Sequence, residues 1–282
     1  TDPIASIKYI SDKEQRSKNW RIIGFMGILS GILILSYYAV IAGWTMAYSV
    51  RTAFGNLNNI DATGAAAMFE SLVSDPERLL AWHTIFIIIT AIVVAKGVKS
   101  GLESAVVRLM PALLVLLLAL VIFSAIEGEF YDGLRFMLYP DFSQITWKSV
   151  LIAMGQAFFS LSLGMGALMV YGSYLSSDIS IPQTCVIVAF LDTTVALLAG
   201  LAIFPIVISS GLEMSQGPGL IFQTLTVAFA SMPGGQLFGT IFFILLIFAA
   251  WTSSISLIEP MIIWLIEKYN VCLLYTSPSP RD

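Results

Sequence analysis

Long uncharged stretches dominate the hydrophobic and polar pattern of the chain. Three of them, residues 24–50, 149–177 and 214–258, contain no Asp, Glu, Lys or Arg. A helix needs about 20 mostly apolar residues to cross a bilayer, and each stretch is longer than that. Strands of outer-membrane barrels alternate in polarity, which these stretches do not. The pattern therefore predicts an all-α, polytopic helical membrane protein.

Six segments are predicted to be membrane helices. They are residues 20–54, 79–98, 102–126, 146–175, 181–209 and 235–268. Several exceed the thickness of a membrane, so we expect tilt, kinks or protruding ends. The connecting segments 56–78 and 127–147 are too polar to span. Segment 211–234 has Gly-Pro-Gly and Pro-Gly-Gly motifs around an amphipathic stretch, 220–230, and is expected to fold back against the protein, with a short helix of its own.

Composition narrows the class of protein further. Of the 282 residues, 57% are hydrophobic and 11% are charged, whereas soluble domains carry about 25% charged residues. So few charges exclude a soluble enzyme, a disordered chain and a disulfide scaffold. The net charge of −4 argues against a nucleic-acid partner. A lipid bilayer is therefore the expected surrounding.

The distribution of basic residues predicts the orientation in the membrane. Nine basic residues lie on the side of the N-terminal end, against four on the other, which is rich in acidic residues. The first group is Lys8, Lys13, Arg16, Lys18, Arg21, Lys96, Lys99, Arg108 and Lys268, and the second is Arg51, Arg78, Arg135 and Lys148. Since cytoplasmic loops carry the excess of Lys and Arg, the N-terminal end of the chain is predicted to be cytoplasmic.

The two ends differ from the rest of the chain. The first stretch, to about Asn19, is polar and basic and is expected to be a loop. Residues 272–282 resemble one reading frame of a transposase-type DNA sequencing adapter, with a native Pro/Ser-rich loop as the alternative. We therefore take residues 1–271 as a partial transmembrane domain and 272–282 as not native.

The fourth predicted helix contains a cluster unsuited to continuous helix. Ser160, Ser162, Gly164 and Gly166 lie within seven residues. Unwound backbone inside a membrane persists where it lines a cavity, and the two helix ends at a break direct their dipoles toward it. The cluster thus favours a binding site for an ion and a charged ligand. A helix-packing face of small residues is the alternative.

Oxygen atoms gather on one face of the last predicted helix. Thr252 and Ser253 follow Ala249 by three and four residues and so lie beside its carbonyl group. Three neutral oxygens in apolar surroundings can hold a small hard cation. The alternative is that the hydroxyls bond back to the preceding turn, as is common in membrane helices.

Two carboxylates occur inside predicted membrane helices. Asp192 lies in the fifth and Glu259, next to Pro260, lies in the sixth. A buried carboxylate is costly in a membrane, so such residues usually face a cavity or a partner. Asp192 is the stronger candidate, because Glu259 beside a proline also suits a structural network.

Five motifs, in order, resemble the neurotransmitter:sodium symporter family, especially its bacterial amino-acid branch. They lie at 37–44 (YYAVIAGW), 155–166 (GQAFFSLSLGMG), 191–205, 217–222 (GPGLIF) and 252–260 (TSSISLIEP), and the resemblance extends from 12 to 270. It implies an inverted-repeat symporter fold of roughly twelve helices with a discontinuous sixth. On that map the chain holds helices three to eight.

The resemblance also implies roles for individual residues. Tyr38 would bond the substrate carboxylate and Phe159 would cover it. The side-chain pocket would be shaped by Ile34, Ile41, Ser162, Met165, Ser253 and Leu257. The two sodium sites would use Ser160 and Asp192 in the first, and Ala249, Thr252 and Ser253 in the second. The gates would use Gln156 on the outer side and Glu267 with Tyr174 on the inner side.

The function implied is sodium-coupled symport of an amino acid or related amine by alternating access, in the bacterial inner membrane. Met165 suggests an adaptable pocket for a larger apolar or aromatic side chain. Asp192 could supply the negative charge that chloride supplies in animal members, so chloride should not be required. Helix one of the family is missing, so the fragment alone should be inactive. Alternatives are a proton-coupled permease that uses Asp192 or Glu259, and a channel. The sequence does not indicate an oligomeric state.

Overall fold

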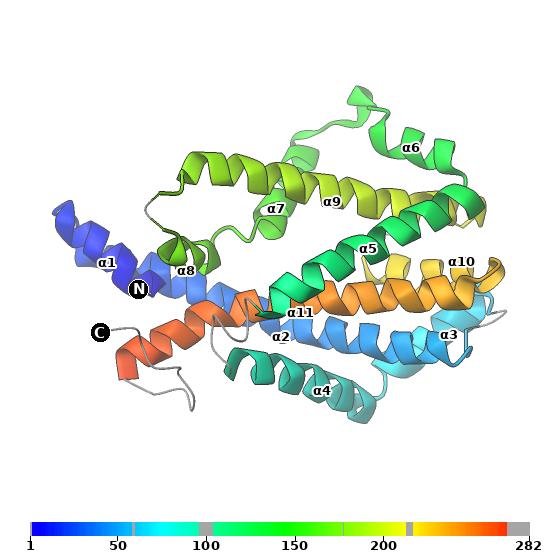
Figure 1. Ribbon diagram of the computed structural model, residues 1–282, viewed down its shortest axis with the longest axis horizontal. Helices are drawn as coiled ribbons and strands as arrows, with labels where there is room; N and C mark the ends of the chain where they lie inside the picture. The colour runs from blue at the N-terminus through cyan, green and yellow to red at the C-terminus, as the bar shows by residue number, and fades with distance from the viewer. Residues whose placement is uncertain (1, 58–59, 96–103, 177, 213–216, 270–282) are drawn as a thin grey trace.

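The computed structural model describes residues 2–57, 60–95, 104–176, 178–212 and 217–269, and these residues form helices and connecting turns without a strand (Figure 1). The helices are α1 (Pro3–Lys13), η1 (Lys18–Trp20), α2 (Arg21–Ala53), α3 (Ala62–Val73), α4 (Pro76–Ala95), α5 (Ser104–Glu127), α6 (Phe130–Leu138), η3 (Phe142–Gln144), α7 (Trp147–Ser160), α8 (Ala167–Tyr174), α9 (Ile181–Ser209), η4 (Leu220–Thr224, a π-helix), α10 (Leu225–Ser231) and α11 (Gly235–Tyr269).

Within the described residues, five helices are long and apolar enough to cross a membrane, namely α2, α4, α5, α9 and α11. They correspond to five of the six predicted segments. The remaining segment, 146–175, forms two short helices, α7 and α8, with non-helical backbone between them. The predicted interruption of that helix is therefore confirmed.

The long helices α2 and α11 lie side by side along the centre of the molecule (Figure 1). Glycines on α2 allow backbones to come close, because a Cβ atom at Gly31 would lie 3.1 Å from the carbonyl oxygen of Leu257 on α11. Near one end of this pair, Tyr48, Phe222 and Phe243 are fully buried in an aromatic core. Burial of such large apolar side chains is what holds the helices together.

The segment after α9 returns to this core, as the sequence predicts. Its two short helices, η4 and α10, bury Phe222, Leu225 and Phe229. These side chains belong to the same buried cluster as Tyr48 of α2 and Phe243 of α11.

Polar groups of α5 and of the turn after it form hydrogen bonds with the backbone around a proline in α9. Pro205 has no N–H, so the carbonyl group of Leu201, four residues earlier, lacks its helical partner. The hydroxyl group of Ser124, which is fully buried, donates to that carbonyl oxygen at 2.8 Å. The backbone N–H of Glu129 donates to the carbonyl oxygen of Pro205 at 3.1 Å. The backbone groups around the proline are thereby satisfied from a neighbouring element.

The N-terminal stretch is helical, so the expectation of a loop was wrong. The side chain of Asp2 caps α1 by accepting from the N–H groups of Ile4 and Ala5, and Pro3 occupies the first helical position. Both features start helices well. The helix then packs against α2, where Gly24 leaves room for the backbone of Pro3 and Ile4. The prediction of a loop rested on polarity and did not consider the helix-start signals at Asp2 and Pro3.

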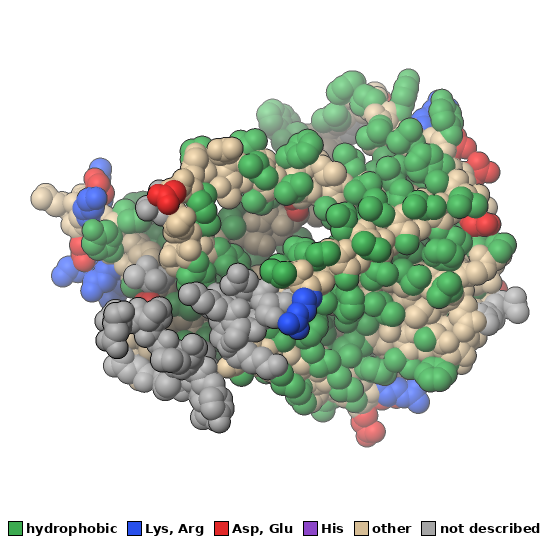
Figure 2. Space-filling model, viewed as in Figure 1, with side chains coloured by type: hydrophobic (Ala, Val, Ile, Leu, Met, Phe, Trp, Pro, Cys, Tyr) green, Lys and Arg blue, Asp and Glu red, His purple; other side chains and the backbone are tan. Residues whose placement is uncertain are grey.

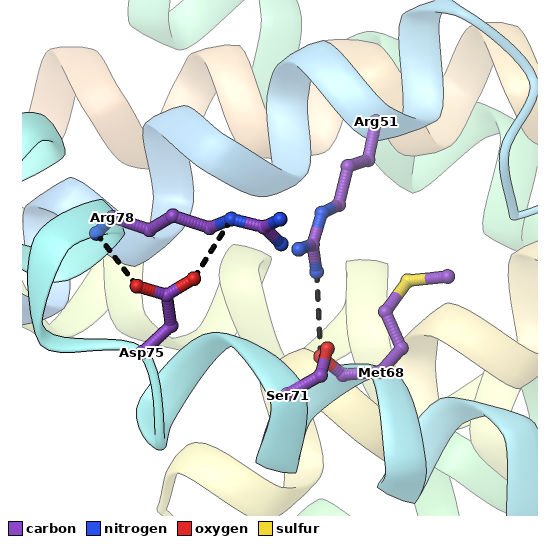
Figure 3. Close-up of polar contacts among 5 residues, drawn as sticks. All are labelled: Arg51, Met68, Ser71, Asp75 and Arg78. Atoms are coloured by element: carbon purple, nitrogen blue, oxygen red, sulfur yellow. Dashed lines mark hydrogen bonds and ion pairs between the residues drawn. The ribbon is translucent and has the colours of Figure 1, made fainter.

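The surface agrees with a membrane location. Hydrophobic side chains cover the middle of the face seen in Figure 2, and charged side chains gather mostly toward the two ends of the long axis. At one end, Arg51 of α2 donates to the carbonyl oxygen of Met68 in α3 at 3.4 Å, and Arg78 of α4 pairs with Asp75 at 2.9 Å (Figure 3). The first contact therefore ties α2 to α3, and the second joins α4 to the turn directly before it.

Some predictions fall on residues that the structure does not describe. The adapter-like segment 272–282 lies outside the described residues, as do Lys96 and Lys99, which entered the orientation argument. The boundary between the second and third predicted helices lies there too.

Candidate functional site

The break between α7 and α8 has backbone that ordinary helix cannot adopt. Ser162, Gly164 and Gly166 have φ angles of 54°, 82° and 78°. Positive φ costs little for glycine but is unfavourable for serine. Ser162 is thus held in an uncommon conformation at the position where the sequence predicts a binding site.

A pocket of about 260 Å³ opens beside this break. It is lined by Ile34, Tyr38, Phe159, Ser160, Ser162, Met165, Ala167, Asp192, Ser253, Ser256 and Leu257. Seven of the eight side chains predicted to bind substrate are among these residues. The eighth, Ile41, packs instead against the buried aromatic core, one helical turn away from the pocket. Residues from α2, α7, α8, α9 and α11 therefore meet in one place.

The two residues predicted for the first sodium site are in contact. The hydroxyl group of Ser160 donates to a carboxylate oxygen of Asp192 at 2.9 Å, which joins the end of α7 to α9. Both side chains line the pocket. The carboxylate is the negative group of the pocket, and its neighbours supply hydroxyl oxygens. Such an all-oxygen set suits a hard cation.

The three residues predicted for the second sodium site, Ala249, Thr252 and Ser253, all lie on α11. The hydroxyl group of Thr252 donates to the carbonyl oxygens of Ala249 at 3.0 Å and Phe248 at 3.2 Å. The Thr252 hydroxyl hydrogen thus bonds back to the preceding turn, as the alternative expects. The lone pairs of the hydroxyl oxygen are still able to bind a cation. Ser253 lines the pocket together with Tyr38.

The predicted gating residues lie on three different helices. Gln156 is exposed on α7. The hydroxyl group of Tyr174 on α8 donates to Glu259 on α11 at 3.5 Å, and Glu259 is only 6% exposed. Glu267, further along α11, accepts from the backbone N–H of Asp2 at 3.1 Å. Glu259 therefore serves a contact between helices, as its place next to a proline suggested.

The sequence reasoning missed Ala167, Ser256 and Tyr171 at this site, of which Ala167, the first residue of α8, contributes apolar lining. Ser256 lines the pocket, and the hydroxyl group of Tyr171 on α8 donates to it at 2.7 Å. Ser256 follows Thr252 and Ser253 by four and three residues, so helical spacing placed it on the same face. That spacing was the available signal for Ser256, whereas Tyr171 needed the fold.

Comparison with known proteins matches this arrangement. The profile of the sodium:neurotransmitter symporter family matches residues 70–277, which reach into the adapter-like segment. The uncharacterized sodium-dependent transporter YhdH of Bacillus subtilis is 38% identical over 247 residues, which are 88% of this chain and 55% of that protein. An uncharacterized sodium-dependent transporter of Haemophilus influenzae is 37% identical over 260 residues, 91% of this chain and 57% of that protein.

A solved structure is also similar. The crystal structure of MhsT in complex with L-phenylalanine superposes with a TM-score of 0.84 at 41% identity, covering 97% of this chain and 61% of that one. The chain thus spans a little over half the length of the relatives it matches. Together with the five spanning helices and the helix that is interrupted between α7 and α8, these matches show that the chain belongs to the sodium:neurotransmitter symporter family.

Proposed function

We infer that the protein containing this chain is a sodium-coupled symporter of an amino acid or related amine. The observation that carries this proposal is the pocket at the helix break, where residues from five helices converge on a hydroxyl-rich cavity with one carboxylate. Family membership supports sodium as the coupling ion. The L-phenylalanine in the MhsT structure supports an amino acid as the substrate.

The pocket suggests how the two ligands are held. The Tyr38 hydroxyl group would donate to the substrate carboxylate, and Phe159 would cover the ligand. The apolar side chains of Ile34, Met165 and Leu257 would surround its side chain. Sodium would lie near Asp192, so that its charge offsets that of both carboxylates. A cation between two carboxylates makes the binding of each partner favour the other, which is the basis of coupling.

Alternating access would follow from the break itself. Two short helices joined by residues with positive φ can change their relative angle, whereas α2 and α11 are long and packed against each other. Movement about the break would open the pocket to one side and then to the other. We place the protein in the bacterial inner membrane with the N-terminal end of the chain cytoplasmic, and the gates at Gln156 and at Tyr174 with Glu267.

Chloride should not be required, because the Asp192 carboxylate supplies a permanent negative charge beside Ser160. Replacing chloride by gluconate should leave uptake unchanged. Uptake that collapses in gluconate would contradict this part of the proposal.

The central test is uptake of radiolabelled amino acids by proteoliposomes that contain the full-length protein. We expect uptake driven by an inward sodium gradient and lost in Tyr38→Phe and Asp192→Asn. Ser36→Ala is the matched control, because the Ser36 hydroxyl is exposed and bonds only to the carbonyl of Leu33 in its own helix. Uptake driven by a pH gradient in sodium-free buffer would instead favour a proton-coupled permease.

A further inference from the structure

The short helix α8 is joined to α11 by a pair of hydroxyl groups. The hydroxyl of Tyr171 donates to the hydroxyl oxygen of Ser256 at 2.7 Å, across 85 positions of sequence. A buried tyrosine hydroxyl needs a partner, and here the partner lines the ligand pocket. Tyr171 therefore acts on the pocket without lining it.

The hydrogen bonds that Ser256 already makes determine whether its hydroxyl group can donate to a ligand or accept from it. Its hydrogen is donated to the carbonyl oxygen of Thr252 at 3.2 Å, one turn earlier in α11. One oxygen lone pair accepts from Tyr171. A serine hydroxyl has one donor and two acceptor positions, so one acceptor position remains and no donor.

We propose that Tyr171 is a positioning residue that holds Ser256 as a hydrogen-bond acceptor in the pocket, so that the site prefers amino acids whose side chain carries a hydrogen-bond donor. The preferred ligands are hydroxylated or N–H-bearing side chains rather than their apolar counterparts of the same shape. This inference rests on the proposed function, because it assumes that an amino acid occupies the pocket.

The surroundings make this acceptor selective. Met165 and Leu257 are buried apolar neighbours that line the same pocket. A ligand hydroxyl placed among them without a partner loses its bonds to water, which is unfavourable. A bond to the Ser256 acceptor offsets that loss for a ligand with a hydroxyl group. An apolar ligand instead leaves the acceptor unpaired. A site built around such a bond discriminates between analogues that differ by one hydroxyl.

The test is competition binding to the purified full-length protein in sodium buffer, using matched pairs of amino acids. The pairs are threonine and valine, tyrosine and phenylalanine, and serine and alanine. We expect the hydroxylated member of at least one pair to bind about tenfold more tightly, the ratio of one net hydrogen bond. Ser256→Ala should abolish or invert that ratio, and Ser256→Thr, which keeps the hydroxyl, should restore it.

Tyr171→Phe tests the positioning role. It should reduce the ratio within the pair while the number of binding sites and their sodium dependence stay unchanged. Ser173→Ala is the control on the same helix, because the Ser173 hydroxyl bonds to the carbonyl of Val170 in α8 at 2.7 Å, away from the pocket. It should leave the ratio unchanged.

The outcomes separate the two proposals. Sodium-dependent binding with ratios below twofold in all three pairs would overturn the donor preference and leave the proposed function standing. A tenfold ratio that persists in Ser256→Ala would also overturn it, because the preference would then come from elsewhere. Absence of sodium-dependent binding for every amino acid would overturn both.

Discussion

Removal of one hydroxyl group should measurably weaken the contact between α5 and α9. In Ser124→Ala the carbonyl oxygen of Leu201 loses its partner, because Pro205 offers no N–H to replace it. Ser124 is fully buried, so water cannot take its place. An orphaned buried acceptor costs about 1–3 kcal/mol, whereas an ordinary serine-to-alanine change on a helix stabilises it by a few tenths of a kcal/mol, because alanine is the better helix former. We expect a loss of about 1–2 kcal/mol in the free energy of unfolding.

The assay is reversible unfolding of the full-length protein in mixed micelles with increasing dodecyl sulfate, followed by circular dichroism. A double-mutant cycle with Pro205→Ala isolates the cause. Alanine at position 205 restores the N–H that can bond the Leu201 carbonyl, so Ser124→Ala should cost much less in that background. A coupling energy of about 1 kcal/mol is expected. Equal costs of Ser124→Ala in both backgrounds would refute the reasoning, since the proline would then have no part in it.

Three further predictions concern backbone conformation and charge. Gly133→Ala should destabilise the protein by about 1–3 kcal/mol in the same assay, because a Cβ atom would lie 2.5 Å from Cγ of Pro205. If Gly133→Ala costs as much in the Pro205→Ala background as in the wild type, this explanation is wrong. Gly164 has a φ of 82°, and no atom lies within 4 Å of a Cβ atom added there. Gly164→Ala should therefore cost about 1–2 kcal/mol through backbone strain alone, and it should lower sodium-dependent binding. Unchanged binding would show that the positive φ at the break between α7 and α8 is not required. Hydrogen bonds from the Thr63 hydroxyl and then from a backbone amide of α3 lower the pKa of Asp61 from its ordinary value of 3.8. Because the folded pKa is the lower one, this support for α3 is present above about pH 4 and is lost as the pH falls through the folded pKa. Protection of the α3 amides against hydrogen exchange, taken relative to the intrinsic rate at each pH, should therefore fall at low pH. Asp61→Asn, which still caps, should remove that pH dependence.

The spans and the helix break could be predicted because their signals are local. Uncharged stretches longer than a bilayer's thickness fix the long helices, and the hydroxyls and glycines between Ser160 and Gly166 cannot form continuous helix without cost. Helix α1 was missed because its start depends on the cap at Asp2 and on packing against Gly24, neither of which hydropathy reports.

The site could be predicted only in part, since its residues come from separate helices. Motif positions brought Tyr38, Asp192 and Leu257 into the expected group, and the pocket contains them. Ile41 was expected there because the family resemblance implied it, but at its level α2 already faces the aromatic core. Helical spacing gives the direction of a side chain, whereas the depth at which core becomes pocket depends on tertiary packing.

The pairing of α2 with α11 has a practical consequence for measuring motion. These two helices share an interface that extends from the aromatic core to the pocket, whereas α7 has no buried residue in this chain. Spectroscopic labels on α2 and α11 would thus define a fixed frame of reference. A third label on α7 or α8 would then report bending at the break as a change in distance from that frame, free of the overall rotation of the molecule.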